Sequence, residues 1–490
     1  MDVLVRLLHT RKNFSSSAVC DEKHVIIGNC LSIINFKITK DSIRLFLFLT
    51  AILINLPICS YSQNNFQSDS VKTFTLEQCI NYALQNQPFL NQSIINQSIV
   101  KTSNAINLSG WLPQLSLSGS LVHFYQLPTT LVANPVSGGP PVAAREGTIN
   151  TFIPEFYASQ TIFDPQLLSA ALKAPLNTKQ AEQITDSTKI FIVSAVSKSF
   201  YNLLMTLDQI NVLKEDTARL GRTVEDTREQ YIEGIVDETD YEQAVITLNN
   251  SDAQLKQQTE NVVPAYAALK QIMGYSPEKQ FNVAFDTTQM DQEINIDTTK
   301  QLEYEKRIEY QELQTAKKLQ SRQTLSNELA FLPSVSAFYT YYDEYENNAY
   351  SNLFKNVYPY STIGLSFNLP IFTGFSRIES IHESALEEDV LDLSEISLKS
   401  QIYTEYSSAL ANYKSNLFNW RLQKDNQVRA KKVFDIVLLQ YEQGIVAYLN
   451  LIVAESNLIS AEIGYVDALY QLLSSKIDLE KAMGELSINY

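Results

Sequence analysis

Residues 231–236 read YIEGIV and residues 441–446 read YEQGIV, so the glycines at positions 234 and 444 lie 210 residues apart. Three further pairs recur in the same order at intervals of 209 to 220 residues: Leu112-Pro113 with Leu332-Pro333, Ile162-Phe163-Asp164 with Ile371-Phe372-Thr373, and Met273-Gly274 with Met483-Gly484. Such an interval indicates a duplicated domain, because solenoid repeats recur about every 20–50 residues. We therefore expect two copies of one structural plan.

A long helix is predicted to lead to each glycine motif. No proline or glycine occurs between residues 376 and 443, which predicts a helix over 376–443, roughly 100 Å long. Its counterpart over 166–233 is interrupted only by Pro175 and Gly221. In the second helix, apolar side chains recur at spacings of three and four, which is typical of a coiled-coil seam. These residues are Ile402, Tyr406, Ala409, Tyr413, Leu417 and Trp420.

Each long helix is expected to end at its glycine, because glycine adopts the positive φ of a helix terminus at little cost. Return helices are predicted over 238–273 and 448–483. Gly234 and Gly444 therefore mark the tips of two helical hairpins. At the start of the first copy, Thr75 and Gln78 form a candidate capping box, which opens a helix running to about Leu108.

Two strand-like segments precede each long helix, at about 113–125 and 152–163 in the first copy and about 334–342 and 361–372 in the second. The last segment alternates most clearly. Its apolar positions are Ile363, Leu365, Phe367, Leu369 and Ile371, and its other face carries Thr362, Gly364, Ser366 and Asn368. This period of two suits a strand between lipid and a water-filled lumen. It also suits a soluble sheet with one buried face.

The number of strands bears on the state of assembly. Four strands cannot close a membrane barrel, since outer-membrane barrels begin near eight strands. Lipid does not tolerate an open sheet edge. If these strands lie in a membrane, several chains must share one barrel. The predicted fold class is therefore a mixed α+β membrane protein with long helical hairpins and shared barrel strands.

A secretory signal is predicted well inside the chain. Lys37, Lys40 and Arg44 precede the apolar stretch 45–56, and small residues follow at the positions that a signal peptidase reads, up to Ser62. Cleavage after Ser62 would make residues 1–62 a removable lead and signal peptide. The apolar stretch is shorter than the roughly 20 residues that span a bilayer, which disfavours a membrane anchor.

Beyond the signal, the chain is predicted to divide into a first repeat over 63–290 and a second over 291–490. Cys79 is the only cysteine in these repeats, which excludes an intramolecular disulfide. Lipidation of Cys59 is an alternative to simple cleavage, although Ile58 precedes it where a small residue is usual. No run of 18 apolar residues follows the signal, so no transmembrane helix is predicted.

Composition and motifs argue against several classes of protein. The formal net charge of −16 disfavours nucleic acid as a partner, because acidic surfaces repel phosphates. No G-x-S-x-G, P-loop or H-E-x-x-H motif occurs. His123 and His382 are the only histidines after the signal and lie far apart without neighbouring cysteines. We therefore expect no catalytic residues, no cofactor and no metal.

The ordered set of motifs resembles the TolC family of outer-membrane efflux proteins over about residues 74–486. The stretch 75–77 resembles the start of the family, 112–116 its first strand entry, 162–164 its strand exit and 231–244 its first tip. The resemblance implies a homotrimer in which each chain gives four strands to one twelve-stranded barrel within outer-membrane lipid. Twelve helices would form a periplasmic tunnel. It also implies a passive exit duct for drug efflux or type I secretion, working with a periplasmic adaptor (membrane fusion protein) and an inner-membrane pump.

The resemblance further implies roles for the hairpin tips. The expected adaptor-contact residues are Tyr231, Gly234, Ile235, Val236, Tyr441, Gly444, Ile445 and Val446. The expected constriction at the tunnel mouth comprises Asp240, Asn450 and Val453. The best-known family members carry two aspartates where this chain has Asn450 and Val453. Rings of these side chains would constrict the mouth sterically or by dewetting, and Asp240 would supply the acidity.

A periplasmic coiled-coil scaffold or adaptor without a membrane barrel is the alternative function. It would explain the long helices and the export signal. It would leave unexplained the four strand-like segments at matched places in the two copies.

Overall fold

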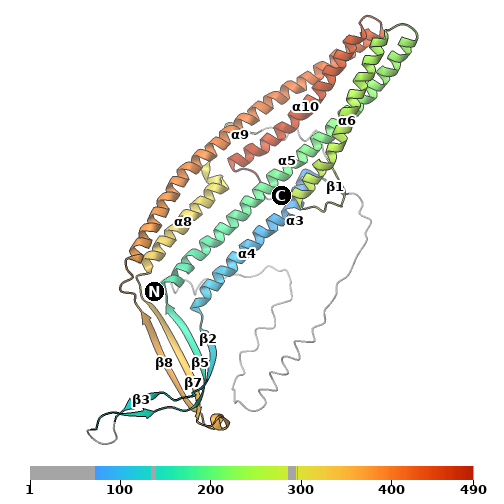
Figure 1. Ribbon diagram of the computed structural model, residues 1–490. Coiled ribbons are helices and arrows are strands. Elements are labelled where there is room, and N and C mark those ends of the chain that lie inside the picture. The colour runs from blue at the N-terminus through green and yellow to red at the C-terminus, as the bar shows by residue number, and fades with distance from the viewer. Residues whose placement is uncertain (1–71, 134–138, 285–293, 295, 489–490) are drawn as a thin grey trace, which may run out of the picture. The chain divides into compact units, whose positions relative to one another are not determined.

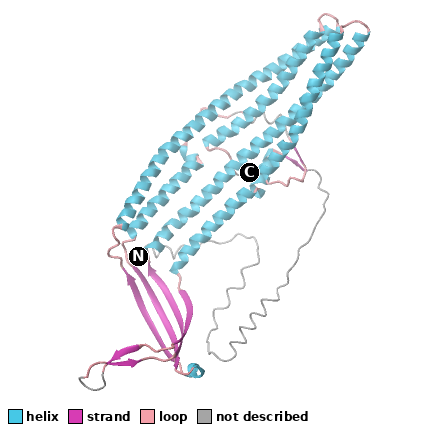
Figure 2. Cartoon of the chain, in the orientation of Figure 1, coloured by secondary structure: helices cyan, strands magenta, loops and turns pink. Residues whose placement is uncertain are grey.

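The computed structural model describes residues 72–133, 139–284, 294 and 296–488 of the 490-residue chain. The described residues lie in one compact unit, Ser70–Tyr490, whose elements are labelled in Figure 1 and coloured by type in Figure 2. The predicted signal peptide, residues 1–62, lies outside the described residues.

Helices make up most of this unit. The first copy contains α3 (Leu76–Asn86), α4 (Pro88–Leu108), α5 (Pro165–Ile232) and α6 (Glu238–Met273). The second copy contains α8 (Ile308–Leu329), α9 (Ser376–Glu442) and α10 (Tyr448–Met483). Three short 3-10 helices are η1 (Ser109–Trp111), η2 (Tyr304–Lys306) and η3 (Tyr350–Lys355). With 68 and 67 residues, α5 and α9 are each roughly 100 Å long.

The predicted capping box at the start of α3 is confirmed. Thr75 Oγ1 accepts a hydrogen bond from the Gln78 N–H at 3.3 Å, and the Thr75 N–H donates to Gln78 Oε1 at 3.0 Å. The expectation of one helix continuing to about Leu108 is wrong, because α3 ends at Asn86 and α4 begins at Pro88. A proline disfavours the helical conformation in the residue before it, and Gln87 is accordingly extended.

Each long helix is accompanied by two shorter ones (Figure 1). Contacts join α5 to α4 and α6, and α9 to α8 and α10. The end of α6 abuts the α3–α4 junction so closely that a Cβ on Gly274 would lie 2.9 Å from the backbone oxygen of Asn86. The end of α10 meets the start of the α8 segment in the same way, and a Cβ on Gly484 would lie 2.8 Å from the Lys306 carbonyl.

The largest hydrophobic core joins the two copies around α5. Cys79 of α3, Val196 and Leu203 of α5, Leu269 of α6 and Leu472 of α10 are all 0 % exposed within it. Among the described residues, α5 also holds an 18-residue window of mean hydropathy 1.5, long and apolar enough to cross a membrane. Because 56 % of that window is buried within the protein, as in the core helix of a soluble protein, it is weak evidence for a span.

Four long antiparallel strands form one sheet in the order β2-β5-β7-β8. These strands are among those drawn in magenta in Figure 2. Their bounds are β2 (Gln114–His123), β5 (Asn150–Phe163), β7 (Ser334–Asn347) and β8 (Tyr358–Asn368). The central pair, β5 with β7, joins the two copies. β7 runs beyond the predicted end at 342 because its last residues pair with the first half of β5. β8 ends before the predicted 372, ahead of Pro370, which has no N–H to donate to a ladder.

Four short strands were not predicted. β3 (Thr129–Val132) and β4 (Val142–Arg145) form an antiparallel hairpin within the loop between β2 and β5. β1 (Lys72–Phe74) pairs in parallel with β6 (Phe281–Val283), which brings the described start of the first copy to the segment after α6.

Candidate functional site

One face of the four-stranded sheet is apolar from edge to edge. Leu117 of β2 pairs with Phe156 of β5, which pairs with Tyr341 of β7. Tyr339, two residues along on the same face of β7, pairs with Ile363 of β8. Leu117 is 77 % exposed and Ile363 is 83 % exposed. Other large exposed residues of this face are Leu115, Leu121, Leu365 and Phe367. A soluble antiparallel sheet normally buries such a face, and the described residues leave it uncovered.

The opposite face of the sheet is polar. Ser118 Oγ donates to Glu155 Oε2 at 3.4 Å, and Tyr342 OH donates to Glu155 Oε1 at 3.1 Å. The Tyr342 ring stacks on Tyr360 with a centroid distance of 4.6 Å. One apolar and one polar face per strand is the arrangement of a strand between lipid and an aqueous lumen.

The two outer strands of the sheet are open edges. Within the described residues, β2 pairs only with β5, and β8 pairs only with β7. Each outer strand therefore presents a row of backbone groups that the sheet does not use. Such an edge is a template for pairing with another strand.

The two hairpin tips have the same backbone geometry. Gly234 has φ 75° and Gly444 has φ 70°, both in the left-handed region. The N–H of Ile235 donates to the carbonyl of Gln230 at 2.8 Å, and the N–H of Ile445 donates to the carbonyl of Gln440 at 2.8 Å. These bonds are those of a Schellman motif, in which a glycine ends a helix and reverses the chain.

The tips combine exposed aliphatic residues with a polar contact between hairpins. Ile235 and Ile445 are 66 % and 70 % exposed, whereas Val236 and Val446 beside them are half-buried. Tyr441 OH donates to Gln230 Oε1 at 2.9 Å, which links α9 to α5. Burial raises the pKa of the Tyr441 phenol.

The remaining predicted site residues lie around this contact. Tyr231 stacks on Tyr241 of α6 with a centroid distance of 6.1 Å. Asp240, half-buried in the first turn of α6, acts electrostatically on Tyr441 and on the buried Tyr448. The structure therefore groups Asp240 with the second tip. Asn450 and Val453 are exposed at the start of α10.

Sequence comparison identifies the family. A family model described as outer membrane efflux protein matches residues 79–275 and 310–485, which are most of the chain and fall in the two copies. The chain belongs to the outer membrane efflux protein family. The resemblance to the TolC family, based on the repeated motifs, is therefore confirmed.

Solved structures of outer-membrane channels share the fold of this efflux protein. A structure of CusC has 16 % identity and a TM-score of 0.68, with 86 % of this chain and 95 % of that chain covered. The Campylobacter jejuni CmeC outer membrane channel has 19 % identity, a TM-score of 0.66 and coverage of 89 % and 95 %. Vibrio cholerae VceC has 15 % identity, a TM-score of 0.65 and coverage of 84 % and 96 %. No curated protein matches the sequence.

The efflux protein also contains a buried charge cluster that the sequence analysis missed. Asp216 and Arg219 of α5 meet Glu455 of α10, and Arg219 Nε donates to Glu455 Oε1 at 3.0 Å. Asp216 and Glu455 are 0 % and 1 % exposed. Glu455 directly follows the apolar stretch 451–454. A carboxylate next to an apolar stretch was the sequence signal that could have indicated a buried acid.

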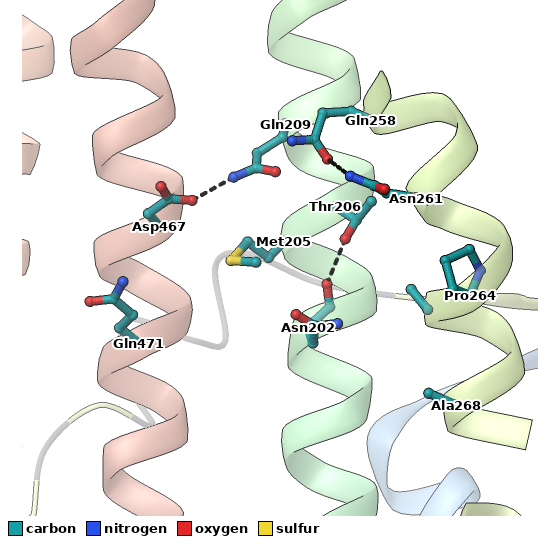
Figure 3. Close-up of a pocket in the computed structure, with 11 residues that line it drawn as sticks. Asn202, Met205, Thr206, Gln209, Gln258, Asn261, Pro264, Ala268, Asp467 and Gln471 are labelled. Carbon is teal, nitrogen blue, oxygen red and sulfur yellow. Dashed lines mark hydrogen bonds between the residues drawn. The ribbon is translucent and has the colours of Figure 1, made fainter. Parts of the chain in front are cut away.

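A polar cavity of about 520 Å³ lies between α5, α6 and α10 of the efflux protein (Figure 3). Its lining is rich in amides, and Gln209 Nε2 donates to Asp467 Oδ1 at 2.5 Å across it. Burial raises the pKa of Asp467. No group of three or more His, Cys, Asp or Glu side chains that could hold a metal occurs in the part of the chain that the structure describes. The residues that line the cavity can thus form hydrogen bonds, and among the described residues they include no group of metal ligands.

Proposed function

We propose that this protein is the outer-membrane exit duct of a tripartite efflux system or a type I secretion system, and that it conducts substrates passively. The observation that carries the proposal is the sheet, which has one uncovered apolar face, one polar face and two open edges. The sheet continues into helices roughly 100 Å long, more than three times the roughly 30 Å hydrocarbon core of a bilayer. The duct would lie in the outer membrane and extend its helices into the periplasm.

The open edges support a trimer. Because four strands cannot close a barrel, β2 of one chain would pair with β8 of the neighbouring chain. Three chains would then close a twelve-stranded barrel. The apolar face would then contact outer-membrane lipid, and the polar face with Glu155 would line the lumen. Outer-membrane channels with the same fold are consistent with this assembly.

An exposed apolar stripe on α9 supports the same assembly. Leu386, Val390, Leu393 and Ile396 recur at spacings of four, three and three residues, and each is at least 60 % exposed. Such a seam is what a helix presents to a partner helix in a coiled coil. We propose that a neighbouring chain covers this apolar stripe in the trimer, so that twelve long helical rods enclose a tunnel.

The tips are proposed to contact the periplasmic adaptor, which in turn links the duct to an inner-membrane pump. Exposed aliphatic side chains such as Ile235 and Ile445 are suited to burial in a protein interface. The tunnel mouth would be lined by Asp240, Asn450 and Val453. With only Asp240 charged, the constriction would act mainly by size and dewetting.

A periplasmic scaffold is the competing function. Its sheet would have to remain in water with Leu117 and Ile363 almost fully exposed, together with the rest of that face. Exposed apolar patches of this kind mark an interaction with protein or membrane. The sheet therefore favours the duct.

The assembly can be tested on the native protein. The protein should fractionate with the outer membrane. After extraction in detergent it should have the mass of three chains, and on gels it should migrate more slowly before heating, as the intact trimer, than after heating, as single chains. Deletion of the chain should raise sensitivity to exported toxic compounds or abolish secretion of a cargo. A water-soluble monomer, or a deletion without either phenotype, would contradict the proposed function.

A second test concerns the tip. Gly444→Val should reduce efflux several-fold, because a β-branched residue at φ 70° costs about 1–3 kcal/mol and the reversal would reorganise. Drug accumulation in cells and cross-linking to the adaptor would measure the loss.

Gly444→Asn is the matched control for this test, because asparagine tolerates the left-handed conformation. It should retain most of the wild-type efflux. If the valine variant is as active as the wild type, the tip does not need this backbone conformation for coupling.

A further inference from the structure

The buried cluster near the tips joins both hairpins. Arg219 of α5 donates from Nε to Glu455 Oε1 of α10 at 3.0 Å and from Nη2 to Asp216 Oδ1 of its own helix. The guanidinium carbon of Arg219 lies 5.0 Å from the ring centroid of Phe434 on α9. One arginine therefore connects α5 of the first hairpin to α9 and α10 of the second.

The charges of this cluster do not balance. Two carboxylates, Asp216 and Glu455, share one guanidinium, which leaves one net negative charge where both carboxylates are almost fully buried. In the described part of the chain, Asp216 Oδ2 and Glu455 Oε2 are buried without a hydrogen-bond partner. Burial of an unpaired charge is costly, and the usual response is to take up a proton.

The surroundings of the cluster add negative charge. The charge of Glu215 of α5 acts on Asp216. Glu462 of α10 interacts electrostatically with Asp216, and Arg219 and then Lys431 of α9 are the cations that act on Glu462. From α6, Asp240 faces Tyr448, which lies beside Glu455. The contact that α6 makes with this part of α5 is uncharged, a hydrogen bond between the hydroxyls of Thr217 and Ser251.

Burial raises the pKa of Asp216 and of Glu455, and the contact of each with Arg219 opposes the rise. Burial also raises the pKa of Glu462. A raised pKa in the folded protein means that the folded state binds a proton that the unfolded chain releases. The stabilisation is complete below the unfolded value of about 4, and it is lost as pH rises to the folded value.

We propose that Asp216, Arg219 and Glu455 form a proton-dependent latch between the two hairpins. With one proton on either carboxyl group, the cluster is neutral. One of the two oxygens without a partner, Asp216 Oδ2 or Glu455 Oε2, then becomes a hydrogen-bond donor. Without that proton, two buried carboxylates repel each other on either side of one arginine, and α10 is held less tightly to α5. The latch is closed at low pH and loosens as pH rises.

The place of the latch suggests what it controls, a consequence that rests on the proposed function. Asp216 lies 18 residues before Gly234, or about 27 Å along α5, and Glu455 lies about 16 Å along α10 from Gly444. A contact so near the tips restrains the separation of the hairpins at the tunnel mouth. Acidification of the periplasm would then hold the mouth closed.

The proton itself can be observed by infrared spectroscopy. The purified full-length protein in detergent should show the C=O stretching band of a protonated carboxyl group at about pH 5, and the band should fade towards about pH 8. Asp216→Asn and Glu455→Gln should each lower the intensity of this band by one carboxyl group, while other carboxyl groups whose pKa is raised by burial, such as Glu462 and Asp467, keep their share of it. Glu225→Gln, at an exposed position of α5, should leave the intensity unchanged. A band that keeps its full wild-type intensity in both amide variants, or no band at any pH, overturns the proposal.

Hydrogen exchange measures the latch itself. After correction for intrinsic rates, exchange of residues 450–460 in the wild type should quicken about tenfold between about pH 5 and about pH 8. Asp216→Asn should exchange slowly at both pH values, because its amide is neutral, and Glu455→Gln provides a second variant should the first fold poorly. Glu225→Gln should keep the wild-type response. If an amide variant keeps it, the latch does not exist. Neither readout involves transport, so the result stands apart from any failure of the proposed function.

Discussion

Gly484→Ala should destabilise the protein by on the order of 2–6 kcal/mol. Gly484 has φ 71°, and a side chain in that conformation costs about 1–3 kcal/mol. The new Cβ would also lie 2.8 Å from the carbonyl carbon and oxygen of Lys306. Since these are backbone atoms, α10 and the segment before α8 would have to separate, which adds about 1–3 kcal/mol of overpacking.

Gly274→Ala should behave in the same way in the first copy. Its φ is 68°, and its Cβ would lie 2.9 Å from Asn86 O and 2.9 Å from the Cα of Gln87. Gly221→Ala is the matched control, because Gly221 lies inside α5 with no atom within 4 Å of its added Cβ. The control should be neutral or should stabilise by about 0.5–1 kcal/mol.

Thermal unfolding of the purified variants, followed by circular dichroism of the helices, would measure these differences. Gly484→Ala and Gly274→Ala should melt several degrees below the wild type, and Gly221→Ala should not. Equal melting of all three variants would show that the helix ends do not meet as tightly as described.

Leu365→Arg should abolish assembly in the outer membrane. Leu365 is 71 % exposed on the apolar face of β8, which we propose contacts lipid. An arginine at mid-bilayer costs about 2–4 kcal/mol, and a trimer would carry that cost three times. Outer-membrane fractions should therefore contain little trimer, measured by gels run without heating.

The control is Ser366→Arg, one residue along on the opposite face of β8. Ser366 pairs with Ser336 of β7 on the polar face, where an arginine can point into water. This variant should assemble as the wild type does. If Leu365→Arg also assembles normally, the apolar face does not contact lipid.

The sequence reveals the parts of the fold that local rules control. A stretch without proline or glycine such as 376–443 can continue as one helix, and a left-handed glycine such as Gly444 ends it. The alternation in 361–372 indicates a strand for the same reason, because neighbouring side chains of a strand point to opposite faces.

Features that depend on distant partners could not be read in this way. β7 extends to Asn347 because β5, from the other copy, pairs with it. Nothing local in the sequence around Thr129 announces the β3–β4 hairpin. Asp216 and Glu455 are ordinary acids in the sequence, and only the packing of α5 on α10 buries them together around Arg219. The break in the helix before Pro88 was not predicted, although the sequence indicates it, because the residue before a proline disfavours the helical conformation.

The parallel pairing of β1 with β6 constrains the order of events when the protein is made. Lys72 aligns with Phe281, so the first strand can pair only after on the order of 200 further residues have been synthesised. Until then the segment Lys72–Phe74 has no strand to pair with, and the two-stranded sheet of β1 and β6 cannot form. This pairing should accordingly be among the last contacts of the first repeat to form during folding.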